Sequence, residues 1–262
     1  LEFRRVLFRS EEAMLALTCQ RAGIRDGMSV LDLGCGWGSL ALYVAEHFPA
    51  SRVLAVSNSR SQGEYIRAEA ARRGLANVEH RAGNIADIEI EETFDRVVSI
   101  EMLEHVRNYE AAFHRIRRWL APGGRVFVHV FANDRFAYTF DAGPDDWMGR
   151  TFFTGGTMPA DDLFLEFREE LRVIDHWRMD GTHYAKTLEA WLATFDRERA
   201  TIQPILEATY GRAAASRWRA RWRLFLLASA EAFGYDDGQR WGVSHYLLAP
   251  ADPPSASAEA AG

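Results

Sequence analysis

Two acidic residues and a histidine stand close together in the segment "SIEMLEHVRNY". If this segment opens a helix, Glu101, Glu104 and His105 occupy positions i, i+3 and i+4, and their side chains converge on one face. Repulsion between carboxylates and withdrawal from water raise the pKa of a carboxyl group toward the range of a general base. Such a group could remove a proton from a substrate, and a carboxylate pair could also bind an ammonium ion.

Two other interpretations of these residues stay open. Acidic side chains are favoured in a solvated first helical turn, where they complement the helix dipole. A carboxylate metal site would need ligands from a second helix, and the sequence holds no second E-x-x-E-H motif. We therefore expect no bound metal ion.

The segment "VLDLGCGWGSL" places three glycines directly after an apolar run. We expect a strand to end before Gly34, and Gly34, Gly36 and Gly38 to form a tight turn whose amides face a ligand. The spacing is not the dinucleotide fingerprint G-x-G-x-x-G, and no G-K-[ST] of a phosphate-binding loop follows. Asp32 would repel phosphate, but it could accept a hydrogen bond from an ammonium group or orient the amides of the turn. These features favour a ligand that is cationic at that end.

The two segments lie within a regular alternation of short apolar runs and helical patterns. This alternation predicts βαβ units, and hence an α/β fold with a doubly wound, mostly parallel, Rossmann-like sheet and a helical substrate-covering insertion. The expected organisation is an unrelated leader at 1–10, a cofactor-binding core at 11–132, a helical and loop-rich substrate cap at 133–240, a closing strand at 241–249 and a disordered tail at 250–262.

Composition narrows the class of protein. The 262 residues are 48% hydrophobic and carry a formal net charge of -6, which argues against a nucleic-acid partner. No run approaches the length of a membrane span, and no signal peptide is visible. The two cysteines, Cys19 and Cys35, are too few for a disulfide framework or a zinc site. We expect a cytoplasmic protein without stable membrane insertion.

The acid and glycine turn resemble the first motif of class I S-adenosylmethionine-dependent methyltransferases, in which this turn holds the methionine part of the cofactor. The second strand of that family usually ends in an acid, where this sequence has Ser57 and Asn58, and Asn84 stands where an aspartate commonly binds adenine. An asparagine carbonyl can accept the same hydrogen bond. The resemblance implies cofactor contacts at Asp32, Gly34, Gly36, Gly38, Ser57, Asn58, Gln62, Asn84 and Ile85.

A narrower resemblance covers residues 11–249. The strings "IEMLEHVRNYEAAF", "DDWMGRTFFTGGTMPADDL" and "AEAFGYDDGQRWGVSHYLL" are similar to the coclaurine N-methyltransferase type within the cyclopropane-fatty-acid-synthase-like group. The lipid-modifying branch of that group has a tyrosine where this chain has Leu224 and Phe225, and commonly a cysteine where it has Thr157. Both departures favour the amine branch.

The resemblance implies an enzyme that transfers a methyl group from S-adenosylmethionine to a small cyclic or aromatic amine. It assigns Glu104 and His105 as base or proton relay and Glu101 as the ammonium anchor. His129 matches a histidine that the lipid branch uses, although a packed strand histidine is the commoner case. A flat aromatic pocket could hold the ring of the amine by stacking and cation–π contact, and the candidates for it are Phe131, His183, Tyr184 and Trp241. Packing in the core is the alternative for each of them.

Two alternatives to amine methylation remain. One is a lipid modification of the cyclopropane-synthase kind. The other is an inactive cofactor-binding remnant, because the family carries a helical N-terminal segment that folds over the cofactor, while "LEFRRVLFRS" matches nothing in its pattern. If that segment is missing, we expect the protein to fold around its sheet but to bind the cofactor weakly.

Overall fold

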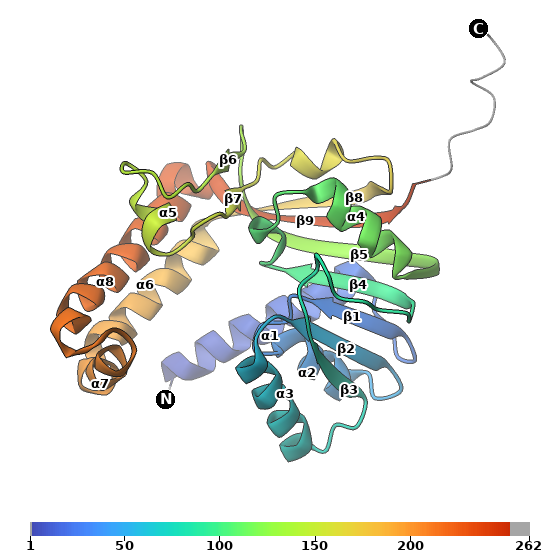
Figure 1. Cartoon of the computed structure of the whole chain (residues 1–262), viewed down its shortest axis with the longest axis horizontal. Helices are drawn as coiled ribbons and strands as arrows, with labels where there is room; N and C mark the ends of the chain where they lie inside the picture. Colours follow the sequence, from blue (N-terminus) through green and yellow to red (C-terminus); the bar gives the residue numbers. More distant parts are fainter. Residues whose placement is uncertain (1, 252–262) are drawn as a thin grey trace, which may run out of the picture. The chain divides into compact units, whose positions relative to one another are not determined.

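The computed structural model describes residues 2–251, with side chains from residue 11 onward, and its largest element is a seven-stranded sheet (Figure 1). The strand order is β3-β2-β1-β4-β5-β9-β8, and the pairings β1–β2, β2–β3, β1–β4 and β4–β5 are parallel. The strands are β1 (Ser29–Leu33), β2 (Arg52–Ser57), β3 (Val78–Ala82), β4 (Phe94–Ile100), β5 (Leu120–Asn133), β8 (Leu171–Asp180) and β9 (Trp241–Pro250). The predicted α/β class with a mostly parallel sheet is confirmed.

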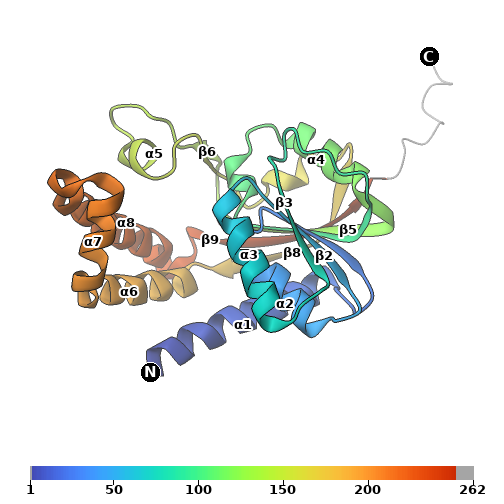
Figure 2. The ribbon, with the colours of Figure 1, turned by 60° about the horizontal axis from the view of Figure 1, so that its bottom comes forward.

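Helices cover both faces of this sheet because its central strands are apolar on both sides. One face, with Val30 and Phe127, packs against α1 (Glu2–Ala22), α2 (Ser39–His47) and α3 (Arg60–Arg73). The opposite face, with Leu31 and Val128, packs against α4 (Tyr109–Arg118). Figure 2 shows α4 on the side of the sheet away from α1 and α2.

The chain divides into two units, of which the first holds most of the sheet. It runs to Val130, and it also includes Asp162–Trp177 and the chain from Ser244 onward. The second unit comprises Phe131–Asp161 and Arg178–Val243. In the second unit α6 (Thr182–Arg197), α7 (Arg199–Tyr210) and α8 (Arg212–Gly234) form a helical cluster. The same unit contains an antiparallel pair of short strands, β6 (Tyr138–Thr139) and β7 (Thr157–Met158), and the chain between them includes α5 (Trp147–Thr151).

These boundaries differ from the expected ones at two places. The cap expected at 133–240 contains β8, which joins the edge of the sheet; its side chains are mostly half-exposed or exposed, so the apolar pattern of a buried strand is absent. The helix expected from residue 11 begins at Glu2, so the backbone of the expected leader at 1–10 continues α1. The closing strand expected at 241–249 corresponds to β9, and most of the expected tail lies outside the described residues. No helix in the described part of the chain is long and apolar enough to cross a membrane.

Candidate active site

The loops that carry the predicted cofactor residues and the acidic cluster lie at the carboxyl ends of the parallel strands. Asp32 of β1 is aligned with Ala55 of β2 on one side and with Val98 of β4 on the other, all three strands running in parallel. The carboxyl ends of the three strands therefore lie side by side. The glycine turn after β1, the loop after β2 and the loop that begins at Glu101 all leave the sheet at this edge.

The three positions of the turn are glycine for different structural reasons. A Cβ on Gly34 would overlap the side chain of Met102, and one on Gly38 would overlap that of Ile66, so packing excludes larger residues at both positions. Gly36 has a φ of 52°, and among the described residues no atom outside Gly36 and its two chain neighbours lies within 4 Å of the place that a Cβ would take. Packing alone thus accounts for Gly34 and Gly38, whereas Gly36 has room for a ligand beside it; cofactor contact at the three glycines stays a prediction. The close approach of Met102 also joins the glycine turn to the loop that carries Glu101.

The backbone amides of the turn differ in whether they are hydrogen-bonded within the protein. The N–H groups of Gly34 and Cys35 both donate to the Val56 carbonyl at 2.9 Å, which ties the start of the turn to β2. For Gly36 and Trp37, no backbone hydrogen bond of the N–H group is found within residues 2–251. A ligand can therefore accept hydrogen bonds from these two amides.

Asp32 is a buried group that supports the turn from below. It is only 2% exposed, and burial raises the pKa of its carboxyl group to about 7, while a hydrogen bond from the backbone N–H of Ala41 in α2 opposes the rise. The hydrogen bond from Ala41 orients one backbone amide of α2, and both predicted roles of Asp32 in the turn stay predictions. In the described part of the chain its Oδ2 atom is buried without a hydrogen-bond partner.

The other predicted cofactor residues follow β2 and β3. Ser57 is buried and its hydroxyl lies 3.0 Å from Nε2 of His80, whereas Asn58 is exposed. Gln62 is half-buried in the first turn of α3, where its N–H donates to the capping hydroxyl of Ser59. These positions leave Asn58 facing solvent beside the turn.

The loop after β3 holds the last two predicted cofactor residues. The carbonyl oxygen of the exposed Asn84 side chain already accepts the N–H of Ala86 at 3.0 Å. A carbonyl oxygen has two lone pairs, so a second donor can still bind there. Ile85 is half-buried against the apolar cluster that includes α4.

The segment with Glu101, Glu104 and His105 does not form the expected helix. Leu103–His105 is a single 3-10 turn, and the α-helix α4 starts only at Tyr109 because the Asn108 side chain caps it. Glu101 lies before the turn with a φ of 52°, a left-handed conformation that non-glycine residues rarely adopt. Backbone outliers of this kind cluster at functional sites, so the loop itself marks Glu101.

The three side chains have very different access to solvent. Glu104 is 1% exposed, Glu101 is 36% exposed at its side chain, and His105 is exposed. Partial desolvation lowers the pKa of His105, and the nearby Glu101 carboxylate opposes this shift. Glu101 and His105 thus lie close enough to interact electrostatically, while Glu104 is buried.

His129 contacts Glu101 at two points, and the sequence ranked this histidine behind the acidic cluster. Its Nε2 atom lies 3.2 Å from Oε1 of Glu101, and its carbonyl accepts the Glu101 N–H at 2.9 Å. The pairing of β4 with β5 puts Ile100 opposite His129 and so creates both contacts. Twenty-eight positions separate the two residues in the chain, and no short motif records the contact.

In the second unit, aromatic rings form a continuous series that includes two of the four predicted substrate residues. The indole N–H of Trp241 donates to the Tyr138 hydroxyl at 3.1 Å, and the ring of Tyr138 contacts Phe140. Phe140 contacts Phe153, which in turn contacts Phe131. Phe131 and Trp241 were predicted from the sequence, whereas the three rings that connect them were missed.

The other two predicted substrate residues lie in α6. Tyr184 packs edge-on against Phe233 with 5.1 Å between ring centroids, inside the helical cluster, and His183 is exposed. Core packing therefore accounts for Tyr184 without a ligand.

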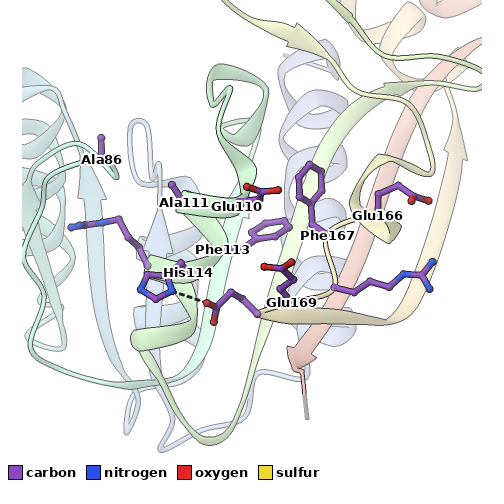
Figure 3. A pocket seen from close by; sticks show the side chains of 11 residues that line it. Ala86, Glu110, Ala111, Phe113, His114, Glu166, Phe167 and Glu169 are labelled. Atoms are coloured by element: carbon purple, nitrogen blue, oxygen red, sulfur yellow. Dashed lines mark hydrogen bonds and ion pairs between the residues drawn. The ribbon is translucent and has the colours of Figure 1, made fainter. Parts of the chain in front are cut away.

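A cavity of about 550 Å³ lies at a different place in the first unit, beside α4 (Figure 3). It is lined by residues of α4 and of the segment 166–170, and the His114 side chain contacts Glu170 across it at 2.6 Å. None of the predicted site residues is among its lining residues. The cavity therefore does not mark the candidate active site.

Comparison with known proteins agrees with this arrangement. Residues 5–241 match the family described as mycolic acid cyclopropane synthetase. (S)-Coclaurine N-methyltransferase of Thalictrum flavum subsp. glaucum is 41% identical over 244 residues, which cover 91% of this chain and 68% of the relative. Cyclopropane-fatty-acyl-phospholipid synthase of Escherichia coli (strain K12) is 29% identical over 89% of this chain and 57% of the relative.

A solved structure shares the fold and a high level of identity. The crystal structure of coclaurine N-methyltransferase bound to N-methylheliamine and SAH superposes with a TM-score of 0.87 at 40% identity, over 91% of this chain and 72% of that one. The predicted enzyme class, an S-adenosylmethionine-dependent methyltransferase, is confirmed by these relatives. The chain belongs to the mycolic acid cyclopropane synthetase family, on its N-methyltransferase side.

Proposed function

We propose that this enzyme transfers the methyl group of S-adenosylmethionine to the nitrogen of a small cyclic or aromatic amine. The observation that carries the proposal is the accessible carboxylate of Glu101, which His129 holds at the same sheet edge as the glycine turn. The identity to N-methyltransferases supports the amine as acceptor more strongly than the lower identity to a lipid-modifying synthase supports a lipid.

The residues around the glycine turn fit the cofactor. Open space beside Gly36, two adjacent amides without backbone partners in the described chain, and the buried Asp32 beneath them form a ready binding turn. Asn58 and Asn84 follow the two neighbouring strands with amide side chains exposed to solvent, and both can bind hydroxyl or amino groups. When bound, S-adenosylmethionine supplies an electrophilic methyl group.

The chain's task in such a transfer is to position the amine and to take its proton. Amines are largely protonated at neutral pH, and holding the nitrogen in line with the methyl group supplies much of the rate. We assign the proton acceptor to Glu101, because its carboxylate is accessible while Glu104 is 1% exposed. This assignment moves the role of proton acceptor from Glu104, to which the resemblance gave it, to Glu101, and it places His105 beside the acceptor.

The aromatic series of the second unit suits the ring of such an amine. Phe131 and Trp241 offer flat faces, and Tyr138 adds a hydroxyl group that is already bound to the Trp241 indole. Aromatic faces bind rings and cations by stacking and cation–π contact. Substrate contacts of His183 and Tyr184 stay predictions, and so do the cytoplasmic location and the absence of a nucleic-acid partner.

The test is mass-spectrometric detection of a one-methyl gain on tetrahydroisoquinoline and simple cyclic amines incubated with the protein and S-adenosylmethionine. Glu101→Gln should lower kcat at least a hundredfold, as the loss of a general base does, and Glu91→Gln, at an exposed position, should leave it unchanged. Methyl transfer by Glu101→Gln at the native rate would refute the role of Glu101.

A parallel incubation with lipid vesicles and labelled cofactor tests the lipid alternative. The proposal expects label on the amine and none on the lipid. Label in the lipid fraction alone would overturn the proposed function.

A further inference from the structure

A line of hydrogen bonds runs from α1 through two strands to Glu101. Nη1 of Arg21 lies 2.7 Å from Nδ1 of His245, Nε2 of His245 lies 2.9 Å from Nδ1 of His129, and Nε2 of His129 lies 3.2 Å from Oε1 of Glu101. Both histidines are at most 2% exposed. All four residues belong to the first unit, and β5 and β9, which carry the histidines, are neighbours in the sheet.

The chemistry of the end groups fixes the direction of every bond in the line. A guanidinium group can only donate, so Nδ1 of His245 accepts. A neutral imidazole then carries its proton on Nε2, and His245 donates to Nδ1 of His129. The same reasoning puts the proton of His129 on Nε2, facing the Glu101 carboxylate.

The surroundings of His245 keep its ring neutral. Burial lowers the pKa of His245 to about 2, and the neighbouring His129 and Arg21 contribute to the decrease. Arg21 is fixed at the outer end, since its guanidinium lies over the Trp177 ring at 4.8 Å from the centroid. Other charged groups near the line are Asp175, which acts on Arg21, and His105, which interacts with Glu101 at the other end.

We infer that Arg21 and His245 are positioning residues for the reaction: they hold His129 in the tautomer that donates from Nε2, and His129 in turn holds the Glu101 carboxylate. The inference rests on the proposed role of Glu101 as proton acceptor. Glu101 needs such support because its backbone is in a left-handed conformation, which costs energy that the surroundings must supply. Without His245, the buried Nδ1 of His129 loses its donor and the ring proton can move to Nδ1. Glu101 then loses the hydrogen bond from Nε2 that favours its charged form.

Nuclear magnetic resonance of the protein without cofactor or amine tests the line directly. Long-range ¹H–¹⁵N spectra of histidine-labelled protein distinguish the two neutral tautomers from the charged form. We expect both His129 and His245 to be neutral with the proton on Nε2. In His245→Gln the amide oxygen can still accept from Arg21 and the amide NH₂ can donate to His129, so the His129 signals should persist. In His245→Phe they should change to another tautomer or to the charged form.

The second test measures the kinetics of methyl transfer to an amine that the native enzyme accepts, and it asks whether the loss of His245 slows the reaction. His245→Phe should lower kcat about tenfold or more with KM values within about threefold, and should move the acid limb of the kcat–pH profile to higher pH, whereas His245→Gln should retain most of kcat. Arg21→Met, at a half-buried position, gives a milder variant with the same direction of change if His245→Phe fails to fold. His47→Phe, at an exposed histidine, is the matched control.

The outcomes separate the inference from the proposed function. Native spectra with a charged or Nδ1-protonated His129 would overturn the line, and unchanged kcat and pH profile in His245→Phe would overturn the positioning role. The expected spectra with no methyl transfer to any amine would support the line and overturn the proposed function instead.

Discussion

Replacing Asp32 by asparagine should change how the stability of the fold depends on pH. Burial raises the pKa of this carboxyl group from 3.8 to about 7 in the folded protein. Between these two values the folded state holds a proton that the unfolded chain has lost. The free energy of unfolding therefore decreases as the pH rises through this window, and below pH 3.8 the group no longer contributes to the dependence.

The size of the effect follows from the width of the window. Each pH unit in which the two states differ by one proton changes the free energy of unfolding by about 1.4 kcal/mol. From about pH 5 to about pH 7 the folded carboxyl group is protonated at the start and half-ionised at the end. The contribution of Asp32 over this interval is a loss of about 2 kcal/mol.

His245 contributes with the opposite sign in the same interval. Its pKa is lowered from 6.5 to about 2 in the folded protein, so below pH 6.5 the unfolded chain binds a proton that the folded state does not. Stability from this group rises with pH by about 2 kcal/mol between about pH 5 and about pH 7. In the native chain the contributions of Asp32 and His245 nearly cancel. In Asp32→Asn the contribution of His245 remains alone, so the free energy of unfolding of this variant should rise with pH.

Urea unfolding of the protein without cofactor, at about pH 5, 6 and 7, measures this dependence. Asparagine keeps the acceptor for the Ala41 amide but introduces a buried NH₂ group, which shifts stability equally at every pH. The informative quantity is the change with pH in the difference between variant and native protein, expected to be about +2 kcal/mol over this interval. Asp87→Asn, at an exposed carboxylate, should show no such change. A difference for Asp32→Asn that is constant across the three pH values would refute the reasoning.

Three further substitutions test the turn and the sheet. Gly34→Ala should lower the free energy of unfolding by about 3 kcal/mol, because a φ of 84° is strained for alanine and its methyl group would overlap Met102; urea unfolding measures it. Gly36→Ala meets open space and should cost only about 1 kcal/mol, yet weaken S-adenosylmethionine binding at least tenfold by calorimetry; native affinity would show that the turn does not approach the cofactor. Asn77→Ala removes donors to the Ala45 and Ser51 carbonyls and should lower the melting temperature by several degrees, corresponding to about 1–2 kcal/mol.

The fold could be predicted because its central strands are continuous apolar runs followed by clear turn residues. "SVLDL" and "FDRVVSI" are buried on both faces, as expected for a parallel sheet. The edge strand β8 has no such run, since polar and apolar residues are mixed along it and only its first residue, Leu171, is buried. An edge strand is defined by its neighbour, which in this case is β9, and local sequence does not report a neighbour that follows three helices later in the chain.

The candidate site was predicted in its residue types but not in its contacts. The glycine turn and the acidic cluster were found from spacing, whereas the reason for Gly34 is the side chain of Met102, which comes from a different loop. A helical spacing was assumed for the acidic cluster, and the cap at Asn108 shows why it fails: the helix starts only at Tyr109, after all three predicted residues. Spacing identified the candidates, and tertiary packing decided which carboxylate reaches solvent.

Strand order explains why the candidate site depends on much of the sheet. The chain moves outward from β1 to β2 and β3 and then returns to place β4 on the other side of β1, so the loops after β1 and β4 lie at the point where the strand order reverses, which is where open α/β sheets bind ligands. The glycine turn and Glu101 belong to these two loops, and the Met102 side chain of the second loop packs against Gly34 of the first. Glu101 is held by β5 through His129, and His129 by β9 through His245. The Glu101 carboxylate, the proposed proton acceptor, thus depends on three adjacent strands, β4, β5 and β9, and we expect a change in β9 to alter the proposed reaction without touching a substrate.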